Sequence, residues 1–396
     1  MKSWSIKIGK ALKVIQREGV INGGKRVFSL IFNFSRMMKK LPGGDVLFIT
    51  NGVGDSALYR TQHVSEELNF NGLKSFVTVA DSPYLLEYAD SFKIFIFHRV
   101  LYTPKIEQFI GKIKERKKEI IFETDDLVFD SKYFKDLDYL KNINSLENKQ
   151  YEKGIGEEIL KDSYVKICAT TTSYLAEKLE EYNKKVYIVP NKLSKRDVEV
   201  CDKIYLKKSS SHQVIRSSVK LGYFSGTLSH NKDFSVITDA LMEIMEKHNN
   251  VELFLVGPLD IENKLNKFKN RIKQFPYVHR EKHFENIASA DINLSPLEMG
   301  NPFCESKSEL KFFEAGIVCV PTVASATQTF REAISDGIDG FTAKDTKEWV
   351  EKLERLILDS KSRRSMGQKA REKTLQKYTT QNAKNEEYYS YLKSRL

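Results

Sequence analysis

Short apolar runs that alternate with helical patterns constrain the fold of this chain more than any other feature. In residues 44–192 the first run is Asp45–Thr50, and a helical pattern at Ser56–Asn71 follows it. The later runs are Ser75–Ala80, Lys93–His98, Glu119–Thr124, Val165–Thr172 and Val186–Pro190. Runs that are bounded by turn residues and separated by helices predict a parallel sheet covered on both faces.

A second series of the same kind follows. Residues 193–214 are rich in Lys and Ser, so they are predicted to be an interdomain linker. The alternation restarts with the runs Val219–Ser225, Val251–Val256, Asp291–Ser295 and Val318–Ser325. The predicted fold class is α/β, with two Rossmann-like, doubly wound domains, residues 44–192 and 215–375, that face each other across a ligand-binding cleft. Residues 376–396 are expected to form a C-terminal helix that can cross back to the N-terminal domain.

The composition excludes several classes of protein. A hydrophobic content of 41% in 396 residues supports folded cores and excludes wholesale disorder. No apolar run reaches the roughly 18 residues of a membrane span, and the N-terminus lacks the pattern of an export signal. The four cysteines are scattered without CxxC spacing, which indicates a reducing compartment and neither a disulfide framework nor a zinc site. We therefore expect a cytoplasmic protein.

The positive charge is concentrated in an N-terminal arm, residues 1–43. Residues 1–40 hold ten Lys or Arg and one Glu, so ten minus one gives +9 of the total +11. Apolar residues interleave with these charges at helical spacing, which is typical of an amphipathic helix on an anionic membrane surface. The alternative is a helical extension that packs on the globular body or on a partner. Nucleic-acid binding is not predicted, because no stacking platform or reader motif accompanies the charge.

Candidate ligand residues in the first domain begin directly after its first run. Gly52 and Gly54 let the backbone approach a ligand closely, or they form a tight turn. The third glycine of a dinucleotide fingerprint is absent, so NAD binding is not predicted. Arg60, on the helix that follows, could reach a phosphate or pair with Glu66 or Glu67.

Polar side chains also close two later runs of this domain. His98 and Arg99 stand where side chains emerge at the carboxyl edge of an α/β sheet. Glu123, Asp125 and Asp126 gather three carboxylates that could accept hydrogen bonds from sugar hydroxyls, and one of them could act as a base. Asp126 could instead cap the next segment. A metal site is not predicted, because no His or further Asp follows at ligand spacing.

The second domain contains two candidate regions. The loop that joins a run to a helix holds Gly226, Thr227, His230 and Lys232, and its small residues and cationic side chain suit a diphosphate, although helix capping would explain the Ser and Thr. The other region is a polar loop and charged helix at 301–316. There a carboxylate could accept both hydroxyls of a ribose, and the alternative is a solvated helix face.

Together these segments resemble the GT-B glycosyltransferases, in particular the large retaining, nucleotide-sugar-dependent family (family 4-like) and its members in bacterial O-antigen and surface polysaccharide assembly. The motifs that carry the resemblance are Phe122-Glu-Thr-Asp-Asp126, Gly222-Tyr-Phe-Ser-Gly-Thr227, Lys307-Ser-Glu-Leu-Lys-Phe312 and Glu314-Ala-Gly316. Thr227 stands where the family often has Arg. Ser306 stands eight residues before Glu314, where the family has a first Glu, and Glu305 is displaced by one position.

The resemblance implies retaining transfer from a nucleotide sugar, for example a UDP- or GDP-sugar, to a glycan or lipid-linked acceptor, without a metal or other cofactor. It assigns catalysis to Lys232, Glu305 and Asp125; donor binding to Gly52, Gly54, Gly226, Thr227, His230, Lys307, Ser308, Glu309, Lys311 and Glu314; and acceptor binding to Arg60, His98, Arg99 and Asp126. The protein would lie peripherally on the inner face of the cytoplasmic membrane. Two alternatives remain: a non-catalytic GT-B subunit that supports another enzyme, and a GT-B sugar-nucleotide epimerase.

Overall fold

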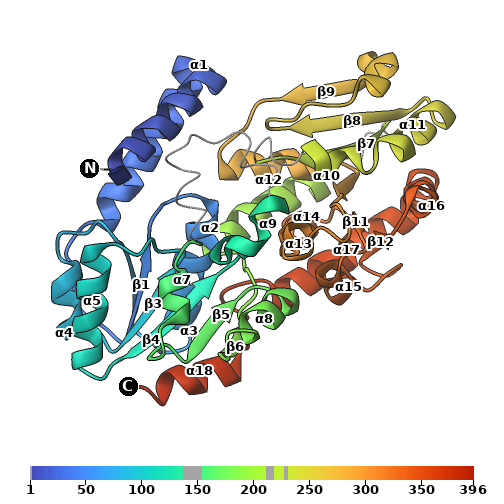
Figure 1. The fold of residues 1–396 in the computed structure, drawn as a ribbon. Coiled ribbons are helices and arrows are strands. Elements are labelled where there is room, and N and C mark those ends of the chain that lie inside the picture. Colours follow the sequence, from blue (N-terminus) through green and yellow to red (C-terminus); the bar gives the residue numbers. More distant parts are fainter. Residues whose placement is uncertain (1, 137–153, 211–217, 227–230) are drawn as a thin grey trace. The chain divides into compact units, whose positions relative to one another are not determined.

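Two units, each with its own parallel sheet, make up this computed structural model, which describes residues 2–136, 154–210, 218–226 and 231–396 (Figure 1). The N-terminal unit comprises residues 1–192 and 383–396, and the C-terminal unit comprises residues 193–382. No helix among the described residues is long and apolar enough to cross a membrane.

The sheet of the N-terminal unit has six strands in the order β2-β1-β3-β4-β5-β6, and every neighbouring pair is parallel. The strands are β1 Val46–Thr50, β2 Ser75–Val79, β3 Ile94–His98, β4 Glu119–Thr124, β5 Ile167–Thr170 and β6 Lys185–Ile188. β1 and β3 are buried along their whole length, which explains why they are apolar at every position except the last, Thr50 and His98, and do not alternate.

Helices connect these strands. They are α2 Asp55–Ala57, α3 Val64–Phe70, α4 Tyr88–Ser91, α5 Pro104–Glu115, α7 Glu157–Lys161 and α8 Ser173–Glu180. A π-helical turn, Leu58–His63, lies between α2 and α3 and directs Arg60, Thr61 and His63 into the interior. π-Turns of this kind are rare inside helices and occur frequently at functional sites.

The sheet of the C-terminal unit has the order β12-β11-β10-β7-β8-β9, again with parallel neighbours. Its strands are β7 Val219–Phe224, β8 Val251–Val256, β9 Ile272–Phe275, β10 Ile292–Ser295, β11 Thr322–Ser325 and β12 Gly340–Ala343. The helices are α9 Lys195–Ser210, α10 Asn231–Ser235, α11 Thr238–Lys247, α12 Arg280–Ser289, α13 Pro302–Glu305, α14 Leu310–Gly316, α15 Gln328–Ala333, α16 Thr346–Leu358 and α17 Ser360–Lys377.

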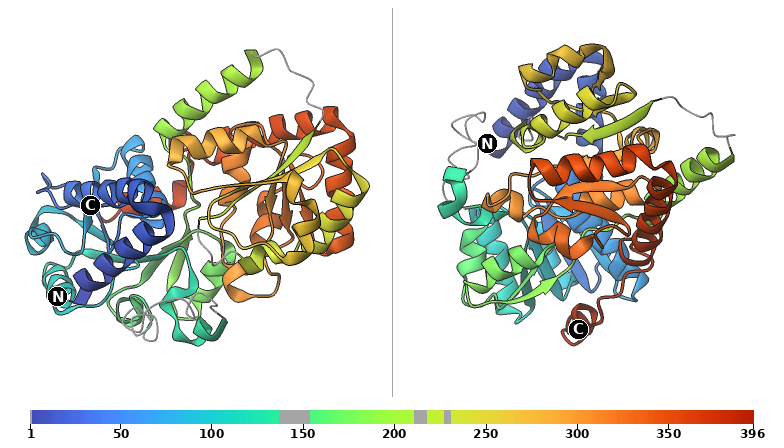
Figure 2. Two further views of the ribbon diagram at one scale, coloured as in Figure 1. Left: turned by 90° about the horizontal axis from the view of Figure 1, so that it is seen from above. Right: turned by 90° about the vertical axis from the view of Figure 1, so that its right-hand side faces the viewer.

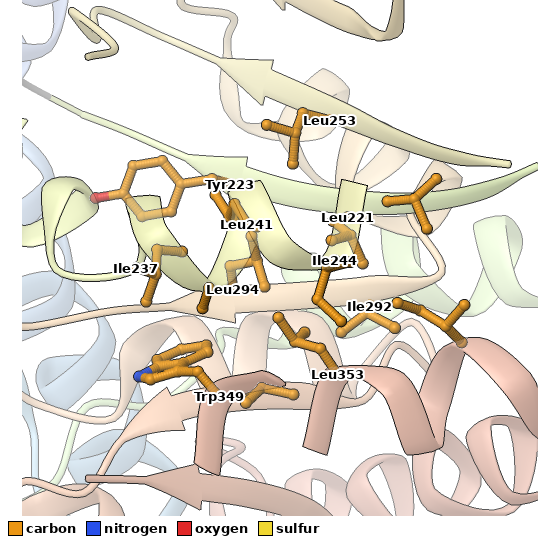
Figure 3. Packing of buried hydrophobic residues seen from close by; sticks show 14 of the residues in the cluster. Leu221, Tyr223, Ile237, Leu241, Ile244, Leu253, Ile292, Leu294, Trp349 and Leu353 are labelled. Atoms are coloured by element: carbon orange, nitrogen blue, oxygen red, sulfur yellow. The ribbon is translucent and has the colours of Figure 1, made fainter. Parts of the chain in front are cut away.

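The core of the C-terminal unit lies between the sheet and two helices. Leu221 of β7 and Leu294 of β10 pack with Leu241 of α11 and with Trp349 and Leu353 of α16 (Figure 3). All five side chains are almost completely buried. This core fixes the carboxyl ends of β7 and β10, beside which the candidate donor residues stand.

In the segment 193–214, expected to be a linker, the described residues 193–210 are largely helical. Helix α9 begins at a cap in which Asp197 accepts hydrogen bonds from the backbone N–H (3.0 Å) and the hydroxyl (2.8 Å) of Ser194. Arg280 of α12 donates to the same carboxylate at 2.6 and 2.9 Å. The sequence analysis did not predict this helix. Its composition is rich in Lys, and Arg280, which stabilises its start, lies 83 residues further along the chain than Asp197.

The two ends of the chain both belong to the N-terminal unit. Helix α18, Glu386–Lys393, buries Tyr388, Tyr389 and Leu392 in the core that contains β1 and β3. The hydroxyl of Tyr389 donates to Glu67 of α3. Helix α1, Lys2–Met37, precedes β1 and bends at Gly19 (Figure 2).

Candidate active site

A chain of polar contacts joins the carboxyl ends of β3 and β4 in the N-terminal unit. His98 is the last residue of β3, and the parallel register places Glu123 of β4 beside it. His98 Nδ1 contacts Glu123 Oε2, and both side chains are only 2% exposed. His98 Nε2 lies 3.0 Å from the hydroxyl of Ser56 in α2. The interior of the unit thus fixes the orientation of the imidazole ring.

Ser56 extends this chain to Asp125. Its hydroxyl donates to Asp125 Oδ2 at 2.7 Å, while Arg99 Nη1 donates to Asp125 Oδ1 at 3.3 Å. Burial opposes ionisation of Asp125, but the charges of Arg99 and His98 and the hydrogen bond from Ser56 outweigh it, so the pKa of Asp125 falls to about 2. Asp125 is therefore an ionised carboxylate at neutral pH. Its side chain is 15% exposed, which leaves it within reach of a ligand.

Arg60 has a different place from the one predicted. Its side chain is 1% exposed and donates to Glu123 Oε1 at 2.7 Å, to the carbonyl of Val189 at 2.7 Å and to Asn191 Oδ1 at 3.0 Å. It pairs with neither Glu66 nor Glu67. The interior of the unit thus occupies the guanidinium group of Arg60, and its role in acceptor binding stays a prediction.

Two further predicted positions of this unit have local explanations. Asp126 caps the turn that follows β4, because its side chain accepts from the N–H of Leu127 at 2.8 Å. Gly52 and Gly54 lie in the loop after β1, and a Cβ atom added at either would meet nothing within 4 Å. The loop therefore has open space beside its backbone, and no tight packing requires glycine there.

In the C-terminal unit, Glu314 of α14 faces Arg280 and His283 of α12. His283 Nε2 lies 3.1 Å from Glu314 Oε2, and Arg280 Nη1 lies 3.6 Å from Oε1. The carboxyl group is largely buried. The sequence analysis missed Arg280 and His283; their spacing of three residues, which puts them on one helical face, was the available signal.

A second charged cluster surrounds Asp233 of α10. Lys307 Nζ donates to Asp233 Oδ2 at 2.7 Å, and the thiol of Cys304 donates to Oδ1 at 3.2 Å. Lys311 of α14 has a lowered pKa, chiefly because of burial and then because of the neighbouring charge of Lys307. Lys232, the predicted diphosphate ligand, directly precedes Asp233 and is exposed. The structure thus concentrates cations at the start of α10 and α14.

Two carboxylates of this unit have structural partners. Glu305 accepts hydrogen bonds from the N–H groups of Gly300 and Gln328, both at 3.1 Å, and so joins a loop to the first residue of α15. Glu309 is buried and is hydrogen-bonded to Tyr378. These contacts give Glu305 and Glu309 a function in folding, while the catalytic role of Glu305 and the donor-binding role of Glu309 stay predictions.

The remaining predicted residues are located as follows. Ser308 lies between α13 and α14, is half-buried and makes polar contacts within the unit. Gly226 follows β7 with nothing within 4 Å of an added Cβ atom. Thr227 and His230 lie outside the described residues. In the described ranges, no three His, Cys, Asp or Glu side chains are grouped so that they could hold a metal ion.

Comparisons with known proteins show what this chain is similar to. Residues 220–359 match the family described as glycosyl transferases group 1. No curated protein matches the sequence. Anabaena HepE, solved with UDP and glucose, has a TM-score of 0.57 at 12% identity and covers 89% of this chain and 100% of its own.

Two further solved structures are similar over nearly the whole chain. A glycosyltransferase from Rickettsia africae has a TM-score of 0.58 at 14% identity, covering 89% of this chain and 99% of its own. Sucrose-phosphate synthase from Thermosynechococcus elongatus has a TM-score of 0.55 at 11% identity, with coverages of 89% and 98%. The chain therefore has the GT-B fold, and the predicted α/β class is confirmed. The match of residues 220–359 to glycosyl transferases group 1 agrees with the resemblance that the sequence motifs carry.

Proposed function

We propose that the protein is a retaining, metal-independent glycosyltransferase that moves a hexosyl group from a nucleotide sugar to a glycan or lipid-linked acceptor in bacterial surface polysaccharide synthesis. The observation that carries the proposal is the group 1 domain at residues 220–359, which contains the cations around Asp233 and the carboxylate of Glu314. HepE was solved with UDP and with UDP-glucose, which makes a UDP-sugar the first donor to test.

The donor contacts come from the C-terminal unit. Lys232, Lys307 and Lys311 supply positive charge for the diphosphate, whose negative charge grows as the bond to the anomeric carbon breaks. Lys307 is held by Asp233 at 2.7 Å, so it is oriented before the donor binds. Glu314, oriented by His283 and Arg280, would accept hydrogen bonds from the ribose hydroxyls.

The acceptor contacts come from the N-terminal unit. Asp125 is ionised at neutral pH and accepts a hydrogen bond from Ser56, so a sugar hydroxyl can take the same kind of bond. Arg99 is only 23% exposed and stays paired with Asp125, where it stabilises the carboxylate. His98 is buried behind Ser56 and orients it. The reaction forms the bond between the acceptor oxygen and the anomeric carbon, breaks the bond from that carbon to the diphosphate oxygen, and passes the proton of the acceptor hydroxyl to the departing nucleoside diphosphate.

The N-terminal arm supports a location at the membrane. Residues 1–40 carry +9 of the net charge, which suits the anionic inner face of the cytoplasmic membrane and a lipid-linked acceptor there. The proposed location is therefore peripheral, on that surface.

The test begins with purified full-length protein and a panel of UDP- and GDP-sugars. A thermal shift identifies the donor, and NMR of the transfer product reports its anomeric configuration. Lys307→Met should reduce kcat/KM at least about 10-fold, because a charge that stabilises the leaving group is lost. Lys264→Met, which removes a cation paired with Asp239 on the surface, is the matched control. An inverted product, or activity that a chelator abolishes, would contradict the retaining, metal-independent assignment.

A second candidate, a non-catalytic partner subunit, is favoured by one observation. Ser306 stands where the family has its first Glu, and the neighbouring Glu305 is bonded to two backbone N–H groups. That candidate predicts donor binding without either transfer or donor hydrolysis, whereas the transferase gives at least slow hydrolysis of its own donor. Turnover of the identified donor therefore separates the two.

A further inference from the structure

Helix α1 is a hairpin of two helical segments. Gly19 has φ 79° and ψ 162°, which breaks the helix between the segments. A Cβ atom added to Gly23 would lie 2.7 Å from Cα of Ile15 and 2.9 Å from the carbonyl oxygen of Val14. In a straight helix, residues eight apart would be separated by about 12 Å. The second segment therefore crosses close to the first, and the absence of a side chain at Gly23 permits this approach.

The second segment is fixed to the N-terminal unit at its end. The carbonyl of Met37 accepts from the hydroxyl of Thr78 in β2 at 3.1 Å. Tyr88 accepts from the N–H of Leu41 at 3.1 Å and donates to the carbonyl of Lys39 at 3.3 Å. These bonds hold the segment that follows the helix, so the orientation of α1 is set by the unit from which it leaves.

The solvent-facing side of the second segment is apolar. Phe28, Ile31 and Phe32 are 71%, 59% and 55% exposed, and their i, i+3, i+4 spacing places them on one face. Lys25 and Arg36 are exposed beside them. A surface helix of a soluble domain turns its apolar side inward, so this arrangement is the reverse of the ordinary one. Exposed apolar side chains bordered by cations are the pattern of a helix that lies in a membrane interface.

We propose that Phe28, Ile31 and Phe32 insert into the interface of an anionic membrane while Lys25 and Arg36 contact lipid headgroups. This inference rests on the proposed membrane association. It adds the identity of the residues that enter the lipid and the orientation of the helix on the membrane. Charge favours a lipid occupant over a second copy of the chain. The first 40 residues of each copy carry +9, so two copies meeting through this face would repel each other, whereas anionic headgroups are attracted.

The experiment measures binding of the full-length protein to sedimented vesicles of phosphatidylcholine alone and of phosphatidylcholine mixed with phosphatidylglycerol. The test variant combines Phe28→Ser, Ile31→Ser and Phe32→Ser. Its control combines Leu206→Ser, Ile338→Ser and Leu358→Ser, which removes three apolar side chains that are 62%, 60% and 70% exposed elsewhere on the chain. A second variant, Lys25→Glu with Arg36→Glu, tests the headgroup contacts.

The expected result is that the wild type and the control bind the phosphatidylglycerol vesicles equally well. The serine variant should lose affinity by at least about 100-fold, because little apolar surface remains to enter the interface. The glutamate variant should lose on the order of 100-fold or more on these vesicles, since two attractive charges become repulsive. Binding of donor nucleotide by both variants should stay at the wild-type level, which reports intact folding.

Three outcomes would overturn the inference. Each can be distinguished from a failure of the proposed glycosyl transfer. If the serine variant binds vesicles as well as the wild type, the membrane association stands and the inserted face is wrong. If the wild type itself does not bind, the membrane association fails, while glycosyl transfer with a soluble acceptor still tests the enzyme. If the serine changes abolish self-association measured by sedimentation and leave vesicle binding unchanged, the face is a contact between copies of the chain.

Discussion

At the scale of single residues, the structure separates side chains that could meet a ligand from side chains that hold them in place. A series of buried contacts runs from Arg60 through Glu123 to His98. It continues through Ser56 to Asp125, whose side chain is partly exposed. Residue type alone could not distinguish these roles, because a buried Arg paired with Glu looks the same in sequence as an Arg that binds phosphate.

Removing the guanidinium of Arg60 tests its structural role. Arg60→Met leaves the buried carboxylate of Glu123 without its guanidinium partner, and we expect the free energy of unfolding to fall by about 3–5 kcal/mol. Arg116→Met removes a comparable pair with Asp90, whose side chain is 63% exposed, and should cost at most about 1 kcal/mol. Urea unfolding of both variants measures the difference. Equal losses would show that the burial of Arg60 has no energetic consequence.

The electrostatics of Asp125 give a pH-dependent prediction. Its pKa is lowered from 3.8 to about 2 in the folded protein, so folding favours the ionised form. The carboxylate therefore contributes stability on the order of 2 kcal/mol above pH 4, and this contribution is lost as the pH falls towards 2. The difference in unfolding free energy between the wild type and Asp125→Asn should shrink over that range. A difference that does not change with pH would contradict the assignment.

At the scale of elements, close helix packing sets the position of α14, which carries Lys311 and Glu314. Its Gly316 approaches α17, since an added Cβ atom would lie 2.5 Å from the hydroxyl of Thr374. Gly367 of α17 in turn lies against the carbonyl group of Cys319, in the turn that leads to β11. The candidate donor residues thus depend on the fit of α17 against the chain after α14.

Gly367→Ala tests this fit. The new methyl group would overlap the carbonyl oxygen of Cys319, so we expect a loss of about 1–3 kcal/mol in unfolding free energy. The matched control is Gly111→Ala in α5, where nothing lies within 4 Å of the added atom; there alanine should stabilise by up to about 1 kcal/mol through its helix propensity. Thermal unfolding reports both. A neutral Gly367→Ala variant would mean that α17 can shift without cost.

At the scale of the whole molecule, the chain completes its first unit with its last residues. Helix α18 contributes Tyr388, Tyr389 and Leu392 to the core of the N-terminal unit, after the complete C-terminal unit has intervened. The N-terminal unit therefore cannot bury its core fully until residues 386–393 are present.

Leu392→Ala is predicted to destabilise the N-terminal unit by about 2–5 kcal/mol, because the side chain is completely buried. Leu396→Ala, at a position that is 45% exposed, should have an effect within about 0.5 kcal/mol. Hydrogen exchange localises the change: protection should fall in β1, β3 and β6, while the core of the C-terminal unit keeps its own protection. Uniform loss in both units would show that they unfold as one body.

The sequence by itself determined the α/β class and the twofold repetition of parallel strands, because strands buried on both faces must be apolar at every position. The motifs at the ends of those strands also carried the resemblance to the GT-B glycosyltransferases, with which the match of residues 220–359 agrees. Tertiary structure alone decided the partners: Glu123 for Arg60, His283 for Glu314 and Asp233 for Lys307. Each pair joins residues at least 31 positions apart, so no local pattern encodes it. Tertiary structure also decided that the apolar face of α1 is exposed. The periodicity of the sequence gives a helix an apolar side, but packing decides which side meets solvent.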